Sequence, residues 1–202
     1  GQLTHLLADH FENVLGIDCS SSQLDQAPPS GNTSYAQQSA ESIDLSDSSV
    51  DLIVAAQSAH WFDLDGFYSE VRRIGSASSI IALICYGVPY IAHPVNTVFQ
   101  RGYWQDVHAF WPRPRRHVEF GYADLFFPFD PIQFGNHECR QEMTVDGLIN
   151  YIKTWSSFEF ACSEGHESNF LQYFELLKAA CSDEDVFEVI WPITVRAGRI
   201  HK

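Results

Sequence analysis

The clearest pattern of apolar and polar positions lies near residue 50. Val50–Val54 is a short apolar run rich in β-branched residues, and it has the length of a buried strand. Small residues follow it, and then Gln57, His60 and Trp61. Ligands of open α/β sheets lie beyond the carboxyl ends of the strands, so this stretch predicts a site. The alternative is that His60 and Trp61 only pack beneath the next helix.

Strand and helix patterns alternate through the first 86 residues. The other strands are predicted at residues 14–17 (closed by Asp18), 35–39 and 80–86, and helices at 1–8, 23–27 and 64–74. In the last helix Phe67, Val71 and Ile74 share one stripe. Such alternation favours an α/β fold with a mostly parallel sheet and right-handed crossovers.

The next region, residues 87–133, is too long for a simple connection and is rich in aromatic residues. We expect an insertion within a single domain that spans residues 1–202. Arg113, Arg115 and Arg116 cluster there, and an arginine fork can hold a carboxylate in two contacts. The alternatives are arginines paired with surface carboxylates, and aromatics that form a core or an interface between copies. A homo-oligomer therefore stays open.

The last third of the chain predicts two helices and a terminal pair of strands. Thr144 would cap a helix over 145–155, and 170–181 is amphipathic. An antiparallel pair is expected at 186–190 and 193–200, with a bend at Trp191–Pro192.

Composition narrows the class of protein. A hydrophobic fraction of 45% supports a real core, and a net charge of -14 argues against binding nucleic acid or an anionic membrane. No run is long enough to span a membrane, and the start lacks the apolar core of a signal peptide. The five cysteines form no CxxC motif, so we expect reduced thiols in a cytoplasmic protein. The histidines lack metal-site spacing, and no metal is assigned.

Two acidic positions offer cofactor chemistry. Asp18 closes a predicted strand, where a carboxylate can accept two hydrogen bonds from the hydroxyls of a ribose. The commoner role of such an aspartate is to cap a helix or hold a loop. The pair Ala40–Glu41 follows the next strand, and a small residue there would let a flat base lie close to the backbone. As a lone dipeptide it is a weak signal.

Taken together, these features resemble a known family. Asp18, Ala40–Glu41 and the segment from Val50 into Gln57–Asp63 are similar to the class I S-adenosylmethionine-dependent methyltransferases, and most similar to the small-molecule branch that includes the trans-aconitate methyltransferases. Further segments resemble that branch: YADLFFPF at 122–129, LINYIKTWSS at 148–157, IWP at 190–192 and VRAGR at 195–199. The resemblance covers nearly the whole chain.

The resemblance implies a Rossmann-like sheet with helices on both faces, S-adenosylmethionine (SAM) as cofactor and a small-molecule acceptor, for which a carboxylic acid would suit the arginines. It implies that the insertion at residues 87–133 is a lid over the substrate, and it implies a catalytic or orienting role for His60. The cofactor residues it implies are Gly1, Asp18, Ala40, Glu41, Gln57 and Trp61. The substrate residues it implies are Arg115, Arg116, Tyr122 and Trp155.

One part of the family pattern is missing. Its first strand leads into a glycine-rich loop against the cofactor, and Gly1 resembles the last glycine of that loop. We therefore expect a sheet without its first central strand. Either the sequence is incomplete, or the chain is a degenerate relative that binds the cofactor poorly.

Three functions remain open at this point. The first is a small-molecule methyltransferase. The second is a non-catalytic relative that binds a hydrophobic ligand or is a structural protein. The third is an inactive subunit that regulates or completes a partner.

Overall fold

The computed structural model describes residues 1–28, 31–182 and 184–201. They form two compact units. Unit 1 comprises Gly1–Ile84, Phe126–Phe134 and Val195–Lys202, and unit 2 comprises Cys85–Leu125 and Gly135–Thr194. The expectation of a single domain with a lid at residues 87–133 stays a prediction.

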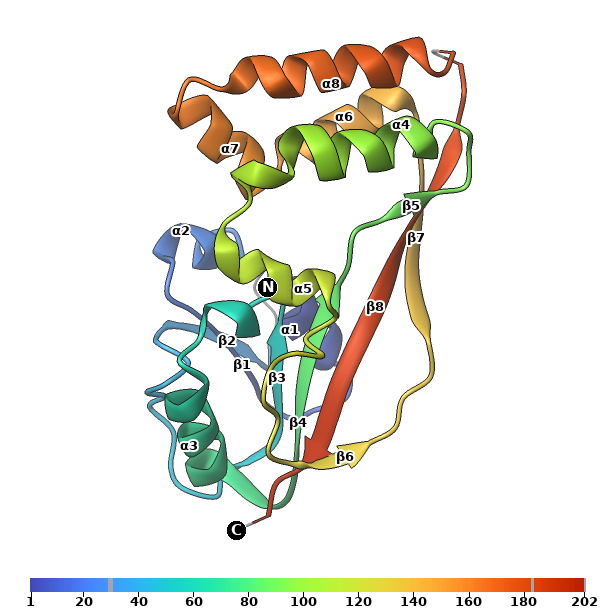
Figure 1. Cartoon of the computed structure of the whole chain (residues 1–202). Helices are drawn as coiled ribbons and strands as arrows, with labels where there is room; N and C mark the ends of the chain where they lie inside the picture. Colours follow the sequence, from blue (N-terminus) through green and yellow to red (C-terminus); the bar gives the residue numbers. More distant parts are fainter. Residues whose placement is uncertain (29–30, 183, 202) are drawn as a thin grey trace. The chain divides into compact units, whose positions relative to one another are not determined.

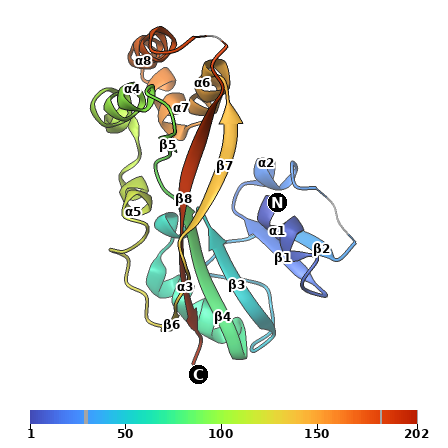
Figure 2. The same ribbon diagram turned by 90° about the vertical axis from the view of Figure 1, so that its right-hand side faces the viewer.

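A two-stranded parallel sheet begins unit 1 (Figure 2). In it β1 (Val14–Asp18) pairs with β2 (Thr33–Gln37). Helix α1 (Gln2–Leu7) precedes β1, and α2 (Ser21–Leu24) lies in the connection. The strand predicted at 14–18 is confirmed, and β2 begins two residues earlier than predicted.

The second sheet has the strand order β3-β4-β8-β5 (Figure 1). These strands are β3 (Val50–Ala56), β4 (Gly75–Tyr86), β5 (Tyr90–Ile91) and β8 (Phe187–Arg199). Strands β3 and β4 are parallel, as predicted, and β4 and β8 each contribute residues to both units. The short strand β6 (Asp130–Ile132) pairs antiparallel with β8 in unit 1. The predicted α/β fold class is confirmed.

Helix α3 (Leu64–Ile74) connects β3 to β4 and has the bounds that its apolar stripe predicts. Asp63 is its N-cap residue, and Arg72 and Arg73 lie in its last turn, where positive charge favours the helix dipole. Val71 is fully buried, and burying a side chain of this size contributes about 1.5–3 kcal/mol. This helix fixes the strand that carries the predicted site.

Arg73 ties α3 to the loop before β3. Its guanidinium donates to the Glu70 carboxylate at 2.6 and 2.8 Å and to the Asp47 carboxylate at 2.8 Å. It also donates to the carbonyl oxygens of Ile43 and Leu45, both at 2.7 Å. A bidentate guanidinium holds this loop in one conformation.

Glu70→Gln is expected to lower stability at pH 7, with a difference from wild type that shrinks in acid. The hydrogen bonds from Arg73 hold the pKa of Glu70 below its usual value of 4.5. Stabilisation by the carboxylate is therefore present above pH 4.5 and is lost as pH falls through the folded pKa. Urea midpoints at pH 7 and about pH 3 measure it. A difference that is independent of pH would contradict this role.

Unit 2 is mainly helical. Its helices are α4 (Asn96–Arg101), α5 (Arg116–Glu119), α6 (Val145–Lys153), α7 (Ser156–Ser163) and α8 (Glu167–Ala179), with the π-helical segment η2 (Gly102–Val107) directly after α4. The Oγ1 atom of Thr144 accepts a hydrogen bond from the Gly147 N–H at 3.2 Å, which confirms the predicted cap of α6. These helices enclose an aromatic core that includes Phe99, Tyr103 and Trp155.

The predicted terminal pair of strands is wrong. Residues 187–199 form the single strand β8, and Trp191–Pro192 lies within it rather than at a bend. The Pro192 carbonyl accepts the Gly87 N–H at 2.9 Å, while Glu138 of a neighbouring strand lies opposite the proline. Pairing by the neighbours thus keeps the backbone extended although proline has no N–H to donate.

That neighbour, β7 (His137–Met143), was not predicted. It pairs antiparallel with β8 over its whole length, and the two run side by side in Figures 1 and 2. Six of its seven residues are exposed, so its sequence HECRQEM lacks the apolar alternation that marks a strand. Arg140 donates to Glu138 at 2.6 Å and to Glu188 at 2.9 Å, which gives the polar face of this pair its contacts.

Gly102 lets η2 approach α8. A Cβ atom at Gly102 would lie 2.1 Å from the ring of Tyr173, which is far inside contact distance. Tyr173 is 1% exposed, and its hydroxyl donates to the Phe99 carbonyl at 2.8 Å. The glycine therefore sets the packing of two elements that carry much of the aromatic core.

None of the helices within the described ranges combines the length and apolar character that crossing a bilayer requires.

Candidate functional site

The end of β3 carries three of the predicted residues. Gln57 follows the strand with a left-handed backbone (φ 54°), and its N–H donates to the Ile84 carbonyl at 2.9 Å. A non-glycine residue in this region is uncommon and often marks a functional site. His60 and Trp61 lie in the short helix η1 (Ala59–Trp61), with ring centroids 4.8 Å apart. Trp61 is 56% exposed, so the core-packing alternative does not apply to it.

Asp18 ends β1 and faces a hollow. The Ser20 N–H donates to its Oδ1 atom at 2.8 Å, which fixes the carboxylate at the carboxyl end of the strand. The hollow has a volume of about 950 Å³ and is lined by Gly1 and Asp18. Residues of β1 and β3 form two of its walls. Among the described residues β1 pairs along one edge, with β2, and β3 pairs along one edge, with β4.

The other predicted cofactor residues do not line this hollow. Ala40, Glu41, Gln57 and Trp61 are absent from its lining, as is His60. The structure therefore brings Gly1 and Asp18 together and leaves the remaining four predicted positions elsewhere in unit 1.

Glu41 has a structural role that its sequence context does not indicate. Its carboxylate accepts hydrogen bonds from the Ser39 hydroxyl and from the N–H of Asp63, the latter at 3.0 Å. Burial alone would raise the pKa of Glu41, but these hydrogen bonds outweigh it and hold the pKa below its usual value. Because Asp63 is the N-cap residue of α3, Glu41 anchors the start of that helix.

The substrate residues predicted from the resemblance all lie in unit 2. Arg115 is half-buried, and its guanidinium carbon lies 4.8 Å from the centre of the Trp111 ring. The Nη1 atom of Arg115 is buried without a hydrogen-bond partner in the described part of the chain. Arg116, at the start of α5, is exposed, as is Arg113. The predicted arginine cluster thus contains one guanidinium that is packed against aromatic rings and two that face solvent.

An aromatic layer surrounds Arg115. The Trp155 ring is 5.3 Å from Trp111 and 5.7 Å from Tyr103, and only 7% of Trp155 is exposed. Burial raises the pKa of Tyr103, and the positive charge of Arg115 opposes that rise. Burial likewise raises the pKa of the Cys85 thiol to about 11, again against the charge of Arg115. These groups stay neutral near pH 7, so the charge of Arg115 is not balanced by them.

The carboxylate of Glu119 contacts the aromatic layer and already has hydrogen-bond partners within the chain. It accepts hydrogen bonds from the Tyr103 hydroxyl at 2.9 Å and from His108 Nε2 at 3.0 Å. Its side chain is 10% exposed. This network orients Tyr103 within the layer.

Tyr122 is fully buried and belongs to a tight turn. Its φ is 60°, that of Gly121 is 59°, and its N–H donates to the His117 carbonyl at 2.7 Å. The left-handed pair turns the chain out of α5. Tyr122 therefore holds the turn that follows α5, and its role as a ligand-contacting residue stays a prediction.

Sequence reasoning missed Trp111. A signal was present, because Trp111 stands four residues before Arg115 in a segment interrupted by Pro112 and Pro114. Prolines at these positions favour a rigid turn, and a rigid turn can hold a tryptophan against the guanidinium that follows.

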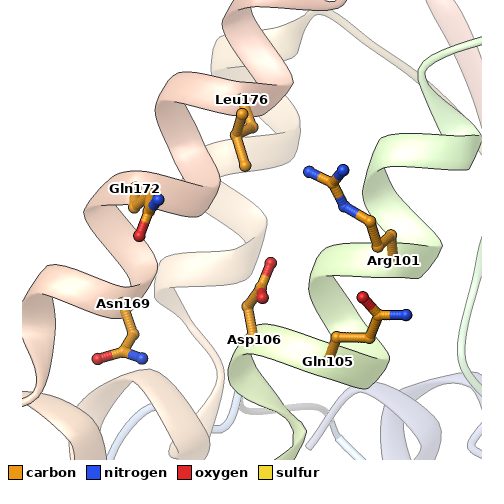
Figure 3. Close-up of a pocket in the computed structure, with 6 residues that line it drawn as sticks. All are labelled: Arg101, Gln105, Asp106, Asn169, Gln172 and Leu176. Atoms are coloured by element: carbon orange, nitrogen blue, oxygen red, sulfur yellow. The ribbon is translucent and has the colours of Figure 1, made fainter.

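A second hollow lies between η2 and α8 (Figure 3). It measures about 250 Å³ and is lined by Arg101, Gln105, Asp106, Asn169, Gln172 and Leu176. The side chains in Figure 3 come from two facing helical segments, and all of the polar ones are exposed. None of the described residues that line it is aromatic, and none of its polar side chains is buried.

Comparison with known proteins identifies the family of this chain. Residues 1–83 match the family model described as a methyltransferase domain. The structure called a putative type II methyltransferase from Anaeromyxobacter dehalogenans is 35% identical, covers all of this chain and 86% of its own, and superimposes with a TM-score of 0.88. The chain belongs to the class I S-adenosylmethionine-dependent methyltransferases. The comparisons do not test the trans-aconitate branch.

Curated relatives of this methyltransferase chain support the same family. A putative methyltransferase of Dictyostelium discoideum is 28% identical over 200 residues, which are 96% of this chain and 76% of the relative. A probable S-adenosylmethionine-dependent methyltransferase of Saccharomyces cerevisiae is 27% identical over 92% of this chain and 77% of the relative. The family model matches residues 1–83, which lie within unit 1.

Proposed function

We propose that this chain transfers the methyl group of SAM to a small carboxylic acid, with SAM bound by unit 1 and the acceptor carboxylate bound by Arg115. The observation that carries the acceptor class is the buried Nη1 atom of Arg115, which has no partner among the described residues. Guanidinium groups pair with carboxylates in preference to neutral groups.

The residues of unit 1 fit SAM at its ribose. Asp18 lines the hollow, and its carboxylate, with one oxygen fixed by the Ser20 N–H, can accept further hydrogen bonds from ribose hydroxyls. The volume of about 950 Å³ falls within the roughly 300–1,000 Å³ of small-molecule and cofactor sites. When bound, SAM supplies an electrophilic methyl group on a sulfonium.

For methyl transfer to a carboxylate, the protein mainly needs to position the acceptor. A carboxylic acid is ionised near neutral pH, so its oxygen attacks without a general base. Arg115 and the aromatic layer would orient the acceptor and exclude water, which raises the rate of an in-line displacement. His60 would serve to orient an acceptor, or to remove a proton if the acceptor is a hydroxyl. Arg116, Tyr122 and Trp155 would complete the acceptor walls.

A second candidate is a relative that binds a carboxylate without transferring a methyl group. It is favoured by the position of Ala40, Glu41, Gln57 and Trp61 outside the hollow that Asp18 lines. In this candidate unit 2 keeps its ligand and unit 1 binds SAM poorly. For either function we propose a cytoplasmic protein that forms homo-oligomers.

Titration calorimetry with SAM tests the cofactor side. We expect saturable binding, and Asp18→Ala is expected to weaken it roughly 10- to 100-fold, because a charge-assisted hydrogen bond contributes about 1.5–3 kcal/mol. Asp25→Ala is the matched control, since Asp25 is exposed at the end of α2 and does not line the hollow. Unchanged affinity in the Asp18 variant would remove its ribose role. No binding by the unaltered chain would favour the second candidate.

A further inference from the structure

Two neighbouring donors in unit 2 are buried without acceptors. In the described part of the chain, the buried side-chain polar atoms that lack a hydrogen-bond partner are Trp111 Nε1, Arg115 Nη1 and Ser157 Oγ. The first two belong to groups in contact, because the guanidinium carbon lies 4.8 Å from the Trp111 ring centre. Leaving a buried donor unpaired costs about 1–3 kcal/mol, and such groups are rare in folded proteins.

The indole N–H groups of other tryptophans in unit 2 have hydrogen-bond acceptors within the chain. Trp191 Nε1 donates to the Tyr151 hydroxyl at 2.9 Å, and Trp104 Nε1 donates to Gln100 Oε1 at 3.2 Å. The Trp155 side chain also makes a hydrogen bond with Tyr151, which lowers the pKa of that phenol against the effect of burial. Among the described residues Trp111 is the exception within this layer, and its ring lies against the guanidinium whose Nη1 atom lacks a partner.

The charge around the pair indicates the class of ligand. The guanidinium stays protonated at all ordinary pH values. The adjacent carboxylate of Glu119 is held by Tyr103 and His108. A ligand that pairs with both buried donors would carry negative charge opposite the guanidinium and offer two oxygen atoms. A carboxylate meets these requirements, because its two coplanar oxygens match the fork of a guanidinium.

We propose that Trp111 is a specificity-determining residue, whose indole N–H binds the same acceptor carboxylate as Arg115 Nη1. The inference rests on the proposed function for the identity of the ligand as acceptor, but the binding it describes does not require SAM. Neither the family comparison nor the sequence pattern assigns this residue. The pair gives two-point recognition with one fixed charge and one neutral donor, so a neutral amide of the same shape is rejected.

The probe for the experiment is benzoate, with benzamide as its neutral counterpart of similar shape. The ¹⁵N-labelled chain has five tryptophans, and their indole N–H signals can be followed separately by NMR. Trp111→Phe identifies the Trp111 signal and retains an aromatic ring. We expect benzoate to move that signal downfield in a saturable manner without SAM, and benzamide to leave it in place.

Variants separate recognition from packing. Trp111→Phe is expected to weaken benzoate binding roughly tenfold, because one hydrogen bond to a charged group is lost. Trp104→Phe is the matched control, since the indole of Trp104 already donates to Gln100 and its side chain is 47% exposed. It should leave affinity unchanged. Thermal unfolding of each variant checks that the fold is kept.

Four outcomes overturn the inference: a Trp111 signal that ignores benzoate in the unaltered chain, equal binding of benzamide, full affinity in Trp111→Phe, or an equal response to inorganic phosphate. The first is measured on the unaltered chain, once Trp111→Phe has identified the signal. Failure of SAM binding in calorimetry would leave a positive benzoate result intact, so failure of the proposed function and failure of this inference are distinguishable.

Discussion

Arg115→Met is expected to lower kcat/KM for a carboxylic acid acceptor by about 100-fold or more. Removing one partner of a buried, hydrogen-bonded charge pair costs about 2–5 kcal/mol, and Arg115 carries a buried guanidinium nitrogen without a partner among the described residues. Methionine retains a long apolar stem beside the Trp111 ring and removes the charge. Steady-state kinetics with varied acceptor at saturating SAM measures the effect.

The control for this prediction is Arg101→Met. Arg101 lies in the same unit, is exposed and lines the polar hollow of Figure 3. The affinity for SAM should be the same in both variants, since Asp18 belongs to unit 1. An Arg115 variant with kcat/KM near that of wild type would show that the acceptor binds elsewhere.

Gly102→Ala is expected to destabilise unit 2 by about 3 kcal/mol. The added Cβ would lie 2.1 Å from the ring of Tyr173, and Tyr173 is buried with its hydroxyl held by the Phe99 carbonyl. Forcing extra carbon into a packed core usually costs about 1–3 kcal/mol, and this contact lies at the severe end of that range. Denaturant unfolding followed by tryptophan fluorescence measures it.

Gly147→Ala provides the comparison. Gly147 lies in α6 of the same unit, and a Cβ there would meet its nearest neighbour at an ordinary 3.5 Å. Alanine favours a helix over glycine by about 1 kcal/mol, so this variant should be neutral or more stable. If the two substitutions had equal effects, the close approach of η2 to α8 would not be what requires glycine at position 102.

Strong periodicity made part of this fold predictable. The bounds of α3 follow from its apolar stripe, and β1 and β3 follow from short apolar runs. Strands β7 and β8 could not be predicted in the same way. The residues of β7 are almost all exposed, and β8 keeps an internal proline because its neighbours hold it extended.

Residues of the candidate site could be predicted where their neighbours in the sequence indicate their role. Asp18 follows from its place at the end of a strand, and Arg115 from a cluster of arginines in an acidic chain. Glu41 did not indicate a cofactor site reliably, because its carboxylate accepts a hydrogen bond from the Asp63 N–H at the start of α3. Trp111 needed the structure, since an unpaired indole becomes visible only when the partners of its neighbours are known.

The most direct test is methyl transfer itself. The chain is incubated with methyl-tritiated SAM and a panel of small carboxylic acids, and the products are then treated with alkali. The account predicts label in a methyl ester, which alkali releases as methanol, and loss of that label in the Arg115→Met variant. Label that appears only in alkali-stable products, or no transfer to any carboxylic acid by a chain that binds SAM, would contradict it.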